Sequence, residues 1–317
     1  MPYTNIISRT DAQALMPEQV VNDLLSGLQN QSAALTMFRH VTMAKGQTRL
    51  PVLSALPTAY FVNGDTGLKQ TTEANWANKY LNAEELAAIV PIPENVLDDA
   101  DYDVWGEITP LLQQAVGRAL DAAVFFGTNK PSSWPNAIVT DASTAGNTVT
   151  RGTNNAAAGA IFGDLSDLFA TIEADGYDVD GLVAGTGYKG RLRQARSTQG
   201  VALDDVFAAE IRDMIKYPMR GLWPTGSGTA EAIAGDFTQG ILGIRKDFTY
   251  KVLDQAVIQD NTGAIVYNLA QQDMVGLRIV FRCAFQVANT INWDKQQDPT
   301  ASITSGSAYP FGVLVAP

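Results

Sequence analysis

Val275-Gly-Leu-Arg-Ile-Val-Phe-Arg-Cys-Ala-Phe-Gln-Val287 is the stretch that decides the fold, because its odd-numbered positions are all apolar. Arginine and glutamine occupy several of the even positions. Successive side chains of a strand point to opposite faces, so the pattern predicts a strand with one buried face and one face in water. At about 3.3 Å per residue this strand would span about 43 Å, well beyond the usual length of about five or six residues.

Further strands are predicted on the N-terminal side of this stretch. Apolar side chains alternate from Phe248 to Val252 and again from Ile265 to Leu269. Asp260-Asn-Thr-Gly263 is a turn signal between them. Strands are therefore expected to dominate from residue 241 onward.

The strongest helical pattern lies earlier, where apolar residues between Trp105 and Val124 form one stripe and polar residues take the other face. Pro110 marks a kink or a fresh start. Counted from Pro110, a helix that runs to Phe126 and stops at Gly127 would be about 25 Å long at 1.5 Å per residue. This helix and the long strand together indicate an elongated platform of sheet and helix.

A long hairpin is predicted near the N-terminus. Alternating and proline-punctuated residues from Phe38 to Val62 end at the turn signal Asn63-Gly64 and then Gly67. The return limb runs from about Trp76 to Ile92. A two-stranded ribbon has too little core to be stable alone in water, so it must lie either on its own subunit or on a neighbour.

The remaining segments complete an α/β pattern. A short amphipathic helix is predicted from Pro17 to Leu28, and residues 132–163 are expected to form surface loops at a domain boundary. Then follow a helix around Leu165–Ile172, a strand at Gly181–Ala184, and helices at Tyr188–Arg196 and Val206–Ile215.

The bulk composition narrows the function classes. The chain has 317 residues, 46% of them hydrophobic and 17% charged, and its formal net charge is -11. That charge opposes broad contact with nucleic acid or with anionic membranes. Cys283, the single cysteine, excludes an intrachain disulfide and agrees with synthesis in a reducing cytoplasm. No signal peptide or membrane span is recognisable, so a soluble product is expected.

The most tempting motif for a cofactor is Gly185-Thr-Gly-Tyr-Lys-Gly190, which has the G-x-G-x-x-G spacing of a dinucleotide fingerprint. A nucleotide site needs a second strand after the helix and an acid about twenty residues further on. No second strand is visible in the sequence that follows. Glycines in an ordinary strand-to-helix turn are therefore the better interpretation, and no cofactor is expected.

Other chemical motifs are incomplete. The acidic run Asp98–Asp103 resembles the start of a calcium loop, but Val104 and Pro110 stand where glycine and glutamate are needed, so no metal is expected. His40 has no partners for a catalytic triad, and Cys283 falls on the buried face of the long strand. No reaction has a complete set of residues, which favours a structural protein over an enzyme.

Two stretches resemble the major capsid protein family of tailed bacteriophages, whose architecture is called the Hong Kong 97 fold. The first is Glu84–Leu97 together with the helix that ends Leu120-Asp-Ala-Ala-Val-Phe-Phe-Gly127. The second runs from Gly235–Asp247 through Val266–Arg278 into the long strand. The resemblance implies an α+β fold with an N-terminal arm, an extended loop, a peripheral domain with a long helix and long strands, and an axial α/β domain.

The resemblance also implies the boundaries of these parts. The N-terminal arm would be 1–33 and the extended loop 46–82. The peripheral domain would comprise 34–45, 83–131 and 246–298, and the axial domain 132–245 and 299–317. In the family the extended loop lies across the adjacent subunit, which is what a hairpin without its own core requires. Asn63, Gly64, Gly67 and Lys69 near its tip are therefore expected to make intersubunit contacts.

The implied function is that of a non-enzymatic shell subunit in the virion. Copies would form pentamers and hexamers of an icosahedral shell around double-stranded DNA, without sequence-specific binding or contact with a membrane. Portal and possibly scaffolding or decoration proteins would be its other partners, and assembly would take place in the host cytoplasm. The alternatives are an encapsulin-type compartment shell and, from another class, a nicotinamide-dependent oxidoreductase built on Gly185–Gly190.

Two features of the family are expected to differ here. Only about eighty residues precede Glu84, which leaves no room for a cleaved scaffold segment, so a separate scaffolding protein would be needed, or none. Some members also join subunits covalently through a loop lysine and a distant asparagine. Lys69 and either Asn289 or Asn292 have suitable chemistry, but no flanking motif identifies them, and a free surface lysine is the better interpretation of Lys69.

Overall fold

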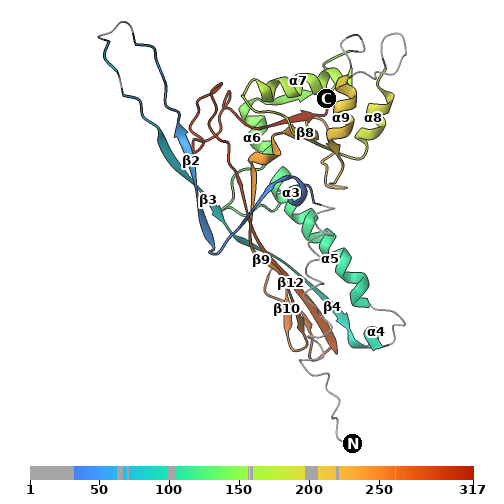
Figure 1. Ribbon diagram of the computed structural model, residues 1–317. Coiled ribbons are helices and arrows are strands. Elements are labelled where there is room, and N and C mark those ends of the chain that lie inside the picture. Colours follow the sequence, from blue (N-terminus) through green and yellow to red (C-terminus); the bar gives the residue numbers. More distant parts are fainter. Residues whose placement is uncertain are drawn as a thin grey trace, which may run out of the picture. The chain divides into compact units, whose positions relative to one another are not determined.

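The computed structural model describes residues 32–62, 67–69, 71–98, 104–155, 157, 160–196, 206–218, 221–260 and 262–317. The chain forms two compact units. The smaller contains Glu85–Gly117 and Lys246–Arg282, and the larger contains Ser32–Glu84, Arg118–Arg245 and Cys283–Pro317. Figure 1 shows both units, and helices and strands are mixed along the chain.

The smaller unit is built mainly from strands. Its strands are β4 (Glu84–Pro93), β9 (Gly240–Leu253), β10 (Val257–Gln259), β11 (Ile265–Asn268) and β12 (Met274–Val287), and its helices are α4 (Glu94–Asp98) and α5 (Val104–Asp121). β9, β12 and β4 lie side by side in that order, and β10 pairs with β11 as a separate two-stranded sheet. The elements β9, β12 and α5 continue into the larger unit.

The long strand predicted from the alternating pattern is confirmed as β12. The rings of Phe281 and Phe248 stack with their centroids 4.6 Å apart, and Phe281 is fully buried. The expectation of an opposite face in water was wrong, because Arg278 and Arg282 are half-buried. The guanidinium Nε atoms of both side chains are buried, so an arginine in the sequence does not by itself mark a face in water.

The long helix ends where the sequence predicts but begins earlier. α5 starts at Val104, so Pro110 lies inside the helix and is not a fresh start. A π-helical turn at Ala122–Phe126 follows, and Gly127 ends it in the left-handed conformation with φ +74°. That conformation is the usual glycine termination of a helix, and the Gly127 N–H donates to the Ala123 carbonyl at 3.2 Å.

The larger unit contains a five-stranded sheet in the order β5-β13-β8-β6-β7. Its strands are β5 (Thr148–Thr150), β6 (Gly181–Ala184), β7 (Ile215–Lys216), β8 (Ala230–Gly235) and β13 (Phe311–Val315). Its helices are α3 (Ala33–Met37), α6 (Ile138–Ala145), α7 (Ile161–Glu173), α8 (Tyr188–Gln194), α9 (Val206–Met214) and the 3-10 turn η3 (Phe237–Gln239). β8 is antiparallel to both β13 and β6, whereas β5 and β7 are parallel to their neighbours.

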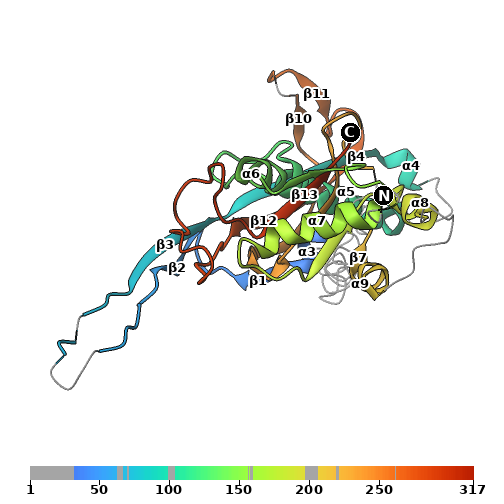
Figure 2. The ribbon, with the colours of Figure 1, turned by 90° about the horizontal axis from the view of Figure 1, so that it is seen from above.

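Helix α7 covers the sheet at β13, and Figure 2 shows it lying across that strand. Gly312 of β13 permits this close approach, because a Cβ there would come within 2.9 Å of the Leu168 methyl group. Leu165, Leu168 and Ile172 of α7 are fully buried in the hydrophobic core of this unit. The expected helix around 165–172 and strand at 181–184 are thereby confirmed.

Two expectations about this region were wrong. Residues 132–163 are not all surface loop, since α6 and β5 lie in that stretch and the Ile138 side chain is fully buried. Thr140, Ser143 and Thr144 give α6 a composition typical of loops, and the helix was therefore not recognised. A second strand does follow the glycine motif, because β7 pairs in parallel with β6 through Leu182 and Ile215. Its two residues are too few for a period-two pattern to reveal.

A cluster of five phenylalanines lies where the ends of several elements meet in the larger unit. The Phe38 ring is at the centre, with centroid distances of 5.6 to 6.4 Å to the others. Its neighbours are Phe125, Phe237, Phe285 and Phe311. Aromatic pairs at these distances add specific geometry to their burial, so the cluster fixes the start of β1 (Arg39–Thr42) against the end of β12 and the start of β13.

The predicted hairpin is confirmed as the antiparallel strands β2 (Gln47–Ala55) and β3 (Asn75–Asn82). The expectation that the return limb runs on to Ile92 was wrong, because β4 is a separate strand that pairs with β12 and not with β2. Several predicted features lie outside the described residues. They are the helix at 17–28, the turn at Asn63-Gly64, most of the acidic run at 98–103, and residue 261 of the turn Asp260-Asn-Thr-Gly263.

Candidate assembly surfaces

The hairpin β2–β3 carries large apolar side chains on a face that no described residue covers. The register pairs Leu53 with Trp76 and Arg49 with Tyr80, so these four side chains share one face of the ribbon. The Trp76 side chain is 71% exposed, and Tyr80 is also exposed. Exposed aromatic residues of this size in a contiguous face are typical of protein–protein contacts.

The exposed apolar surface continues toward the tip. Phe61 is fully exposed and Leu68 is 89% exposed, whereas Gly67 is half-buried and Lys69 exposed. Of the four candidate contact residues, Gly67 and Lys69 lie near the tip of the hairpin, and Asn63 and Gly64 lie outside the described residues. Sequence reasoning missed Trp76 and Tyr80 as contact residues, although their spacing of four in a strand already places them on one face.

The base of the hairpin, by contrast, is anchored in the larger unit. Leu81 is fully buried in a small core with Met43, Ile241, Ala284 and Ala288. Lys79 Nζ donates to the Val287 carbonyl at 2.9 Å, and Gln286 Nε2 donates to the Tyr80 carbonyl at 3.2 Å. The ribbon is therefore held at one end, and its two strands extend away from that end (Figure 1).

A second exposed apolar patch lies on the β10–β11 hairpin of the smaller unit. Ile265 is 64% exposed, and Val257, Val266 and Tyr267 are also exposed. The two strands pair only with each other, and their three and four residues are too short to build a core.

The two candidate asparagines for a covalent link are both engaged inside the larger unit. The buried Asn289 side chain accepts from the Tyr177 hydroxyl at 2.8 Å and donates to the Ala308 carbonyl at 3.2 Å. Asn292 donates to the Asp175 carbonyl and accepts from the Lys295 N–H, both at 2.8 Å. Their amides brace the C-terminal loop, which is an ordinary structural role.

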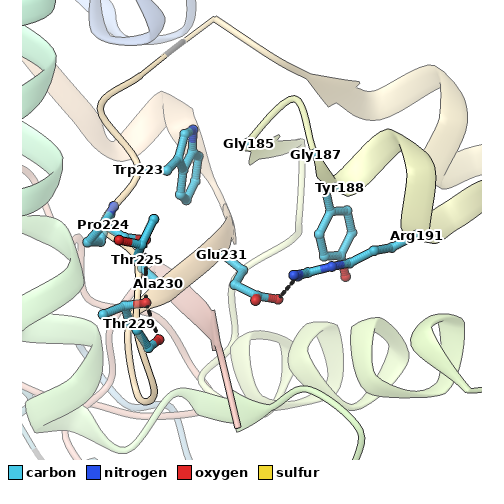
Figure 3. Close-up of a pocket in the computed structure, with 11 residues that line it drawn as sticks. Gly185, Gly187, Tyr188, Arg191, Trp223, Pro224, Thr225, Thr229, Ala230 and Glu231 are labelled. Carbon is cyan, nitrogen blue, oxygen red and sulfur yellow. Dashed lines mark hydrogen bonds and ion pairs between the residues drawn. The ribbon is translucent and has the colours of Figure 1, made fainter.

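The glycine motif lines a pocket of about 320 Å³ between β6, α8 and the loop around Trp223 (Figure 3). The Glu231 carboxylate lies in this pocket and pairs with Arg191 and with Arg151, the latter at 2.6 Å. The single Glu231 carboxylate thus neutralises one of the two arginine charges that could meet a phosphate. A carboxylate at the same place would also repel phosphate.

The backbone of the motif is equally unsuited to a nucleotide. The N–H groups of Tyr188 and Lys189 donate to the carbonyls of Gly185 and Thr186 within the turn, at 2.9 and 3.3 Å. A phosphate-binding turn needs such N–H groups free. Tyr217, and not an acid, follows β7. These contacts support the interpretation of the glycines as a strand-to-helix turn.

The other chemical candidates also have structural explanations. Cys283 is buried, and that burial raises the pKa of its thiol to about 12, which leaves it unreactive. His40 is exposed on β1. In the described part of the chain no three His, Cys, Asp or Glu side chains gather as metal ligands, and no helix has the length and hydropathy to cross a bilayer.

Comparison with known proteins decides between a shell protein and the alternatives. The profile of the Phage capsid family matches residues 12–291, which is most of the chain. The chain belongs to the phage capsid family. It is 35% identical to a solved structure from Microbacterium phage Oxtober96, with a TM-score of 0.75 over 98% of this chain and 100% of that one.

Other solved structures are also similar to this chain. A structure from Mycobacterium phage Bobi is 34% identical, with a TM-score of 0.74 over 98% of this chain and 99% of that one. The capsid of a native GTA particle is 16% identical with a TM-score of 0.61, covers 91% and 90% of the two chains, and shows likeness of fold alone. The comparison with curated proteins gives no match.

These findings confirm the α+β Hong Kong 97-like fold and the function of a major capsid protein of a tailed phage. Copies of such a protein assemble into an icosahedral shell, and the place of the protein is the capsid of the virion. The encapsulin-type alternative is not favoured. The surfaces that matter for this function are therefore those that copies of the capsid protein present to one another.

Proposed function

We propose that the hairpin 46–82 of this capsid protein lies across a second copy and that this contact holds pentamers and hexamers together. The observation that carries the proposal is the uncovered face with Leu53, Trp76 and Tyr80, above a base anchored by Leu81. Burying a large apolar side chain contributes about 1.5–3 kcal/mol, so a face with two aromatic residues is a strong source of association free energy. Asn63, Gly64, Gly67 and Lys69 would extend the same contact.

We also propose the division into parts that the family resemblance implies. Residues 1–33 serve as the N-terminal arm and 46–82 as the extended loop. Residues 34–45, 83–131 and 246–298 form the peripheral domain, and 132–245 with 299–317 form the axial domain. The compact smaller unit, Glu85–Gly117 with Lys246–Arg282, falls inside the proposed peripheral boundaries, which supports them.

The shell encloses double-stranded DNA without sequence-specific binding and has no catalytic step of its own. It assembles in the host cytoplasm with a portal, and separate scaffolding or decoration proteins are candidates for further partners. The formal net charge of -11 supports the first point, because an acidic wall repels phosphate while the genome is packed. DNA held in purified particles should therefore be released on opening at any salt concentration.

Electron microscopy tests the proposal on the expressed protein. The full chain should form closed particles. A variant in which residues 56–74 are replaced by a short glycine-serine turn should keep the circular dichroism of the full chain but form no particles. Particles of normal size from this variant would contradict the role of the hairpin.

A further inference from the structure

A second pocket, of about 530 Å³, lies at the base of the hairpin within the larger unit. Its walls come from β3, from the N-terminal part of α6, from the end of β12 and from the loop at 299–303. Both views show this C-terminal loop beside β3 (Figures 1 and 2). The residues that matter for its chemistry are Asn78, Lys79, Tyr80, Asp141 and Tyr309.

Lys79 brings a positive charge into this pocket. Its Nζ donates one hydrogen bond, to the Val287 carbonyl at 2.9 Å, although an ammonium group has three N–H donors. Burial lowers the pKa of Lys79 to about 8, against the opposing effects of Asp141 and Asp298. The charged amine of Lys79 therefore loses part of its hydration in the isolated subunit, which costs free energy. Among the described residues only one of its three N–H donors has a partner.

Asp141 brings the complementary acceptor. Its carboxylate is 8% exposed and accepts one side-chain hydrogen bond, from Asn136 Nδ2 at 3.0 Å. Burial raises the pKa of Asp141, and Asn136, Lys79 and Lys130 oppose that rise. Among the described residues no ion pair within 4.0 Å joins Lys79 to Asp141, and the buried Tyr309 hydroxyl finds no hydrogen-bond partner.

The pocket thus presents donors and an acceptor that do not satisfy one another. A carboxylate ligand would be repelled by Asp141, and an ammonium ligand would be repelled by Lys79. A peptide group or a side-chain carboxamide has a carbonyl that can accept from Lys79 and an N–H that can donate to Asp141. An amide is therefore the ligand chemistry that fits both groups.

The position of the pocket indicates where the amide comes from. The pocket reaches both faces of β3, because Asn78 and Tyr80 lie on the same face as Trp76 and Lys79 lies on the opposite face. The pocket therefore adjoins the uncovered apolar face. We propose that a peptide or carboxamide group of a second copy of this chain binds between Lys79 and Asp141. This inference rests on the proposed function, in which a second copy covers that face.

The test compares assembly and subunit stability for Lys79→Met in the full chain, with Lys216→Met, an exposed lysine on β7, as the matched control. Lys79→Met should leave the urea midpoint of the subunit unchanged or higher, because removal of a buried charge offsets the loss of the hydrogen bond to the Val287 carbonyl. It should raise the critical concentration for shell formation about tenfold, because a hydrogen bond to a charged group is lost. Lys216→Met should change neither quantity.

Equal critical concentrations for Lys79→Met and the wild type would overturn the pocket assignment and leave the hairpin contact intact. A wild type that forms no shell contradicts the proposed function itself. A map of the wild-type shell that resolves side chains gives a second readout. An amide of a second copy within about 3.2 Å of Lys79 Nζ supports the inference, whereas water alone or residues of the same subunit overturns it.

Discussion

The strand β12 and the hairpin β2–β3 are both alternating, apolar strand segments, yet they use their side chains in opposite ways. β12 buries Leu277, Ile279 and Phe281 within its own subunit. The hairpin leaves Trp76 and Tyr80 exposed. A period-two pattern therefore identifies a strand and its apolar face but not the chain that covers that face. In a protein that acts by assembly, the function depends on which chain covers the apolar face.

The largest effect is expected from the covered strand. Phe281→Ala should lower the free energy of unfolding of the subunit by about 3–5 kcal/mol, because it removes a fully buried ring stacked on Phe248 and leaves a cavity. Urea denaturation followed by circular dichroism measures this change. A loss below about 1 kcal/mol would mean that β12 is not the core that its pattern indicates.

A substitution in the uncovered strand β3 should change shell assembly and leave the stability of the subunit nearly unchanged. Trp76→Ala should leave the free energy of unfolding of the subunit within about 0.5 kcal/mol of the wild type, because the ring is exposed. It should raise the critical concentration for shell assembly about 30-fold, the effect of losing an aromatic hot spot of about 2 kcal/mol. Light scattering over a dilution series checks the second point, and Trp293→Ala, another exposed tryptophan, is the matched control.

A smaller effect is expected at the buried end of the long helix. Asp121 accepts hydrogen bonds from Ser32 Oγ at 2.7 Å and from the N–H groups of Ala33 and Ala34 at 2.9 and 3.1 Å. Burial raises the pKa of Asp121 from 3.8 to about 6, although these three hydrogen bonds lower it. The folded state therefore binds this proton more tightly than the unfolded state does.

The sign of the pH dependence follows. The stabilising contribution of the protonated Asp121 is fully present below pH 3.8 and is lost as the pH rises through about 6. Relative to Asp121→Asn, the wild type should lose on the order of 1–3 kcal/mol of unfolding free energy over this window. Parallel pH series of the two proteins by chemical denaturation measure the difference, and parallel curves would show that the raised pKa is wrong.

The smallest effect on the subunit is expected at the second uncovered patch. Ile265→Thr on β11 should change the free energy of unfolding by less than about 0.5 kcal/mol, because the side chain is 64% exposed. If β10–β11 also contacts a second copy, the melting temperature of the assembled shell should fall while that of the subunit stays the same. Calorimetry of both forms separates these results.

The sequence alone predicted an element correctly where a long periodic pattern or a clear termination signal was present. β12 and the end of the long helix at Gly127 were predicted because alternation and a left-handed glycine have direct physical causes. The strands β5 and β7 were missed, because two or three residues cannot show a period and their pairing with β13 and β6 is a tertiary event. Helix α6 was missed because its threonine, serine and aspartate residues resemble loop composition.

The functional surfaces were harder to predict than the fold. The family was inferred from the resemblance of two stretches of sequence. The hairpin was recognised as a contact element because a two-stranded ribbon has no core of its own. The polar pocket of Lys79 and Asp141 has no sequence signal, since it joins residues from β3 and α6 that are far apart in the chain. Asn289 and Asn292 were chemically plausible for a covalent link, and only their hydrogen bonds revealed a bracing role.

Hydroxyl-radical footprinting of tryptophan side chains, compared between unassembled subunits and assembled shells, probes the covering of the hairpin directly. Trp76 should be oxidised readily in the subunit and be protected at least about tenfold in the shell, while Trp134, which is 7% exposed, stays protected in both. Equal oxidation of Trp76 in the two forms would contradict the account, because the face would then remain uncovered after assembly.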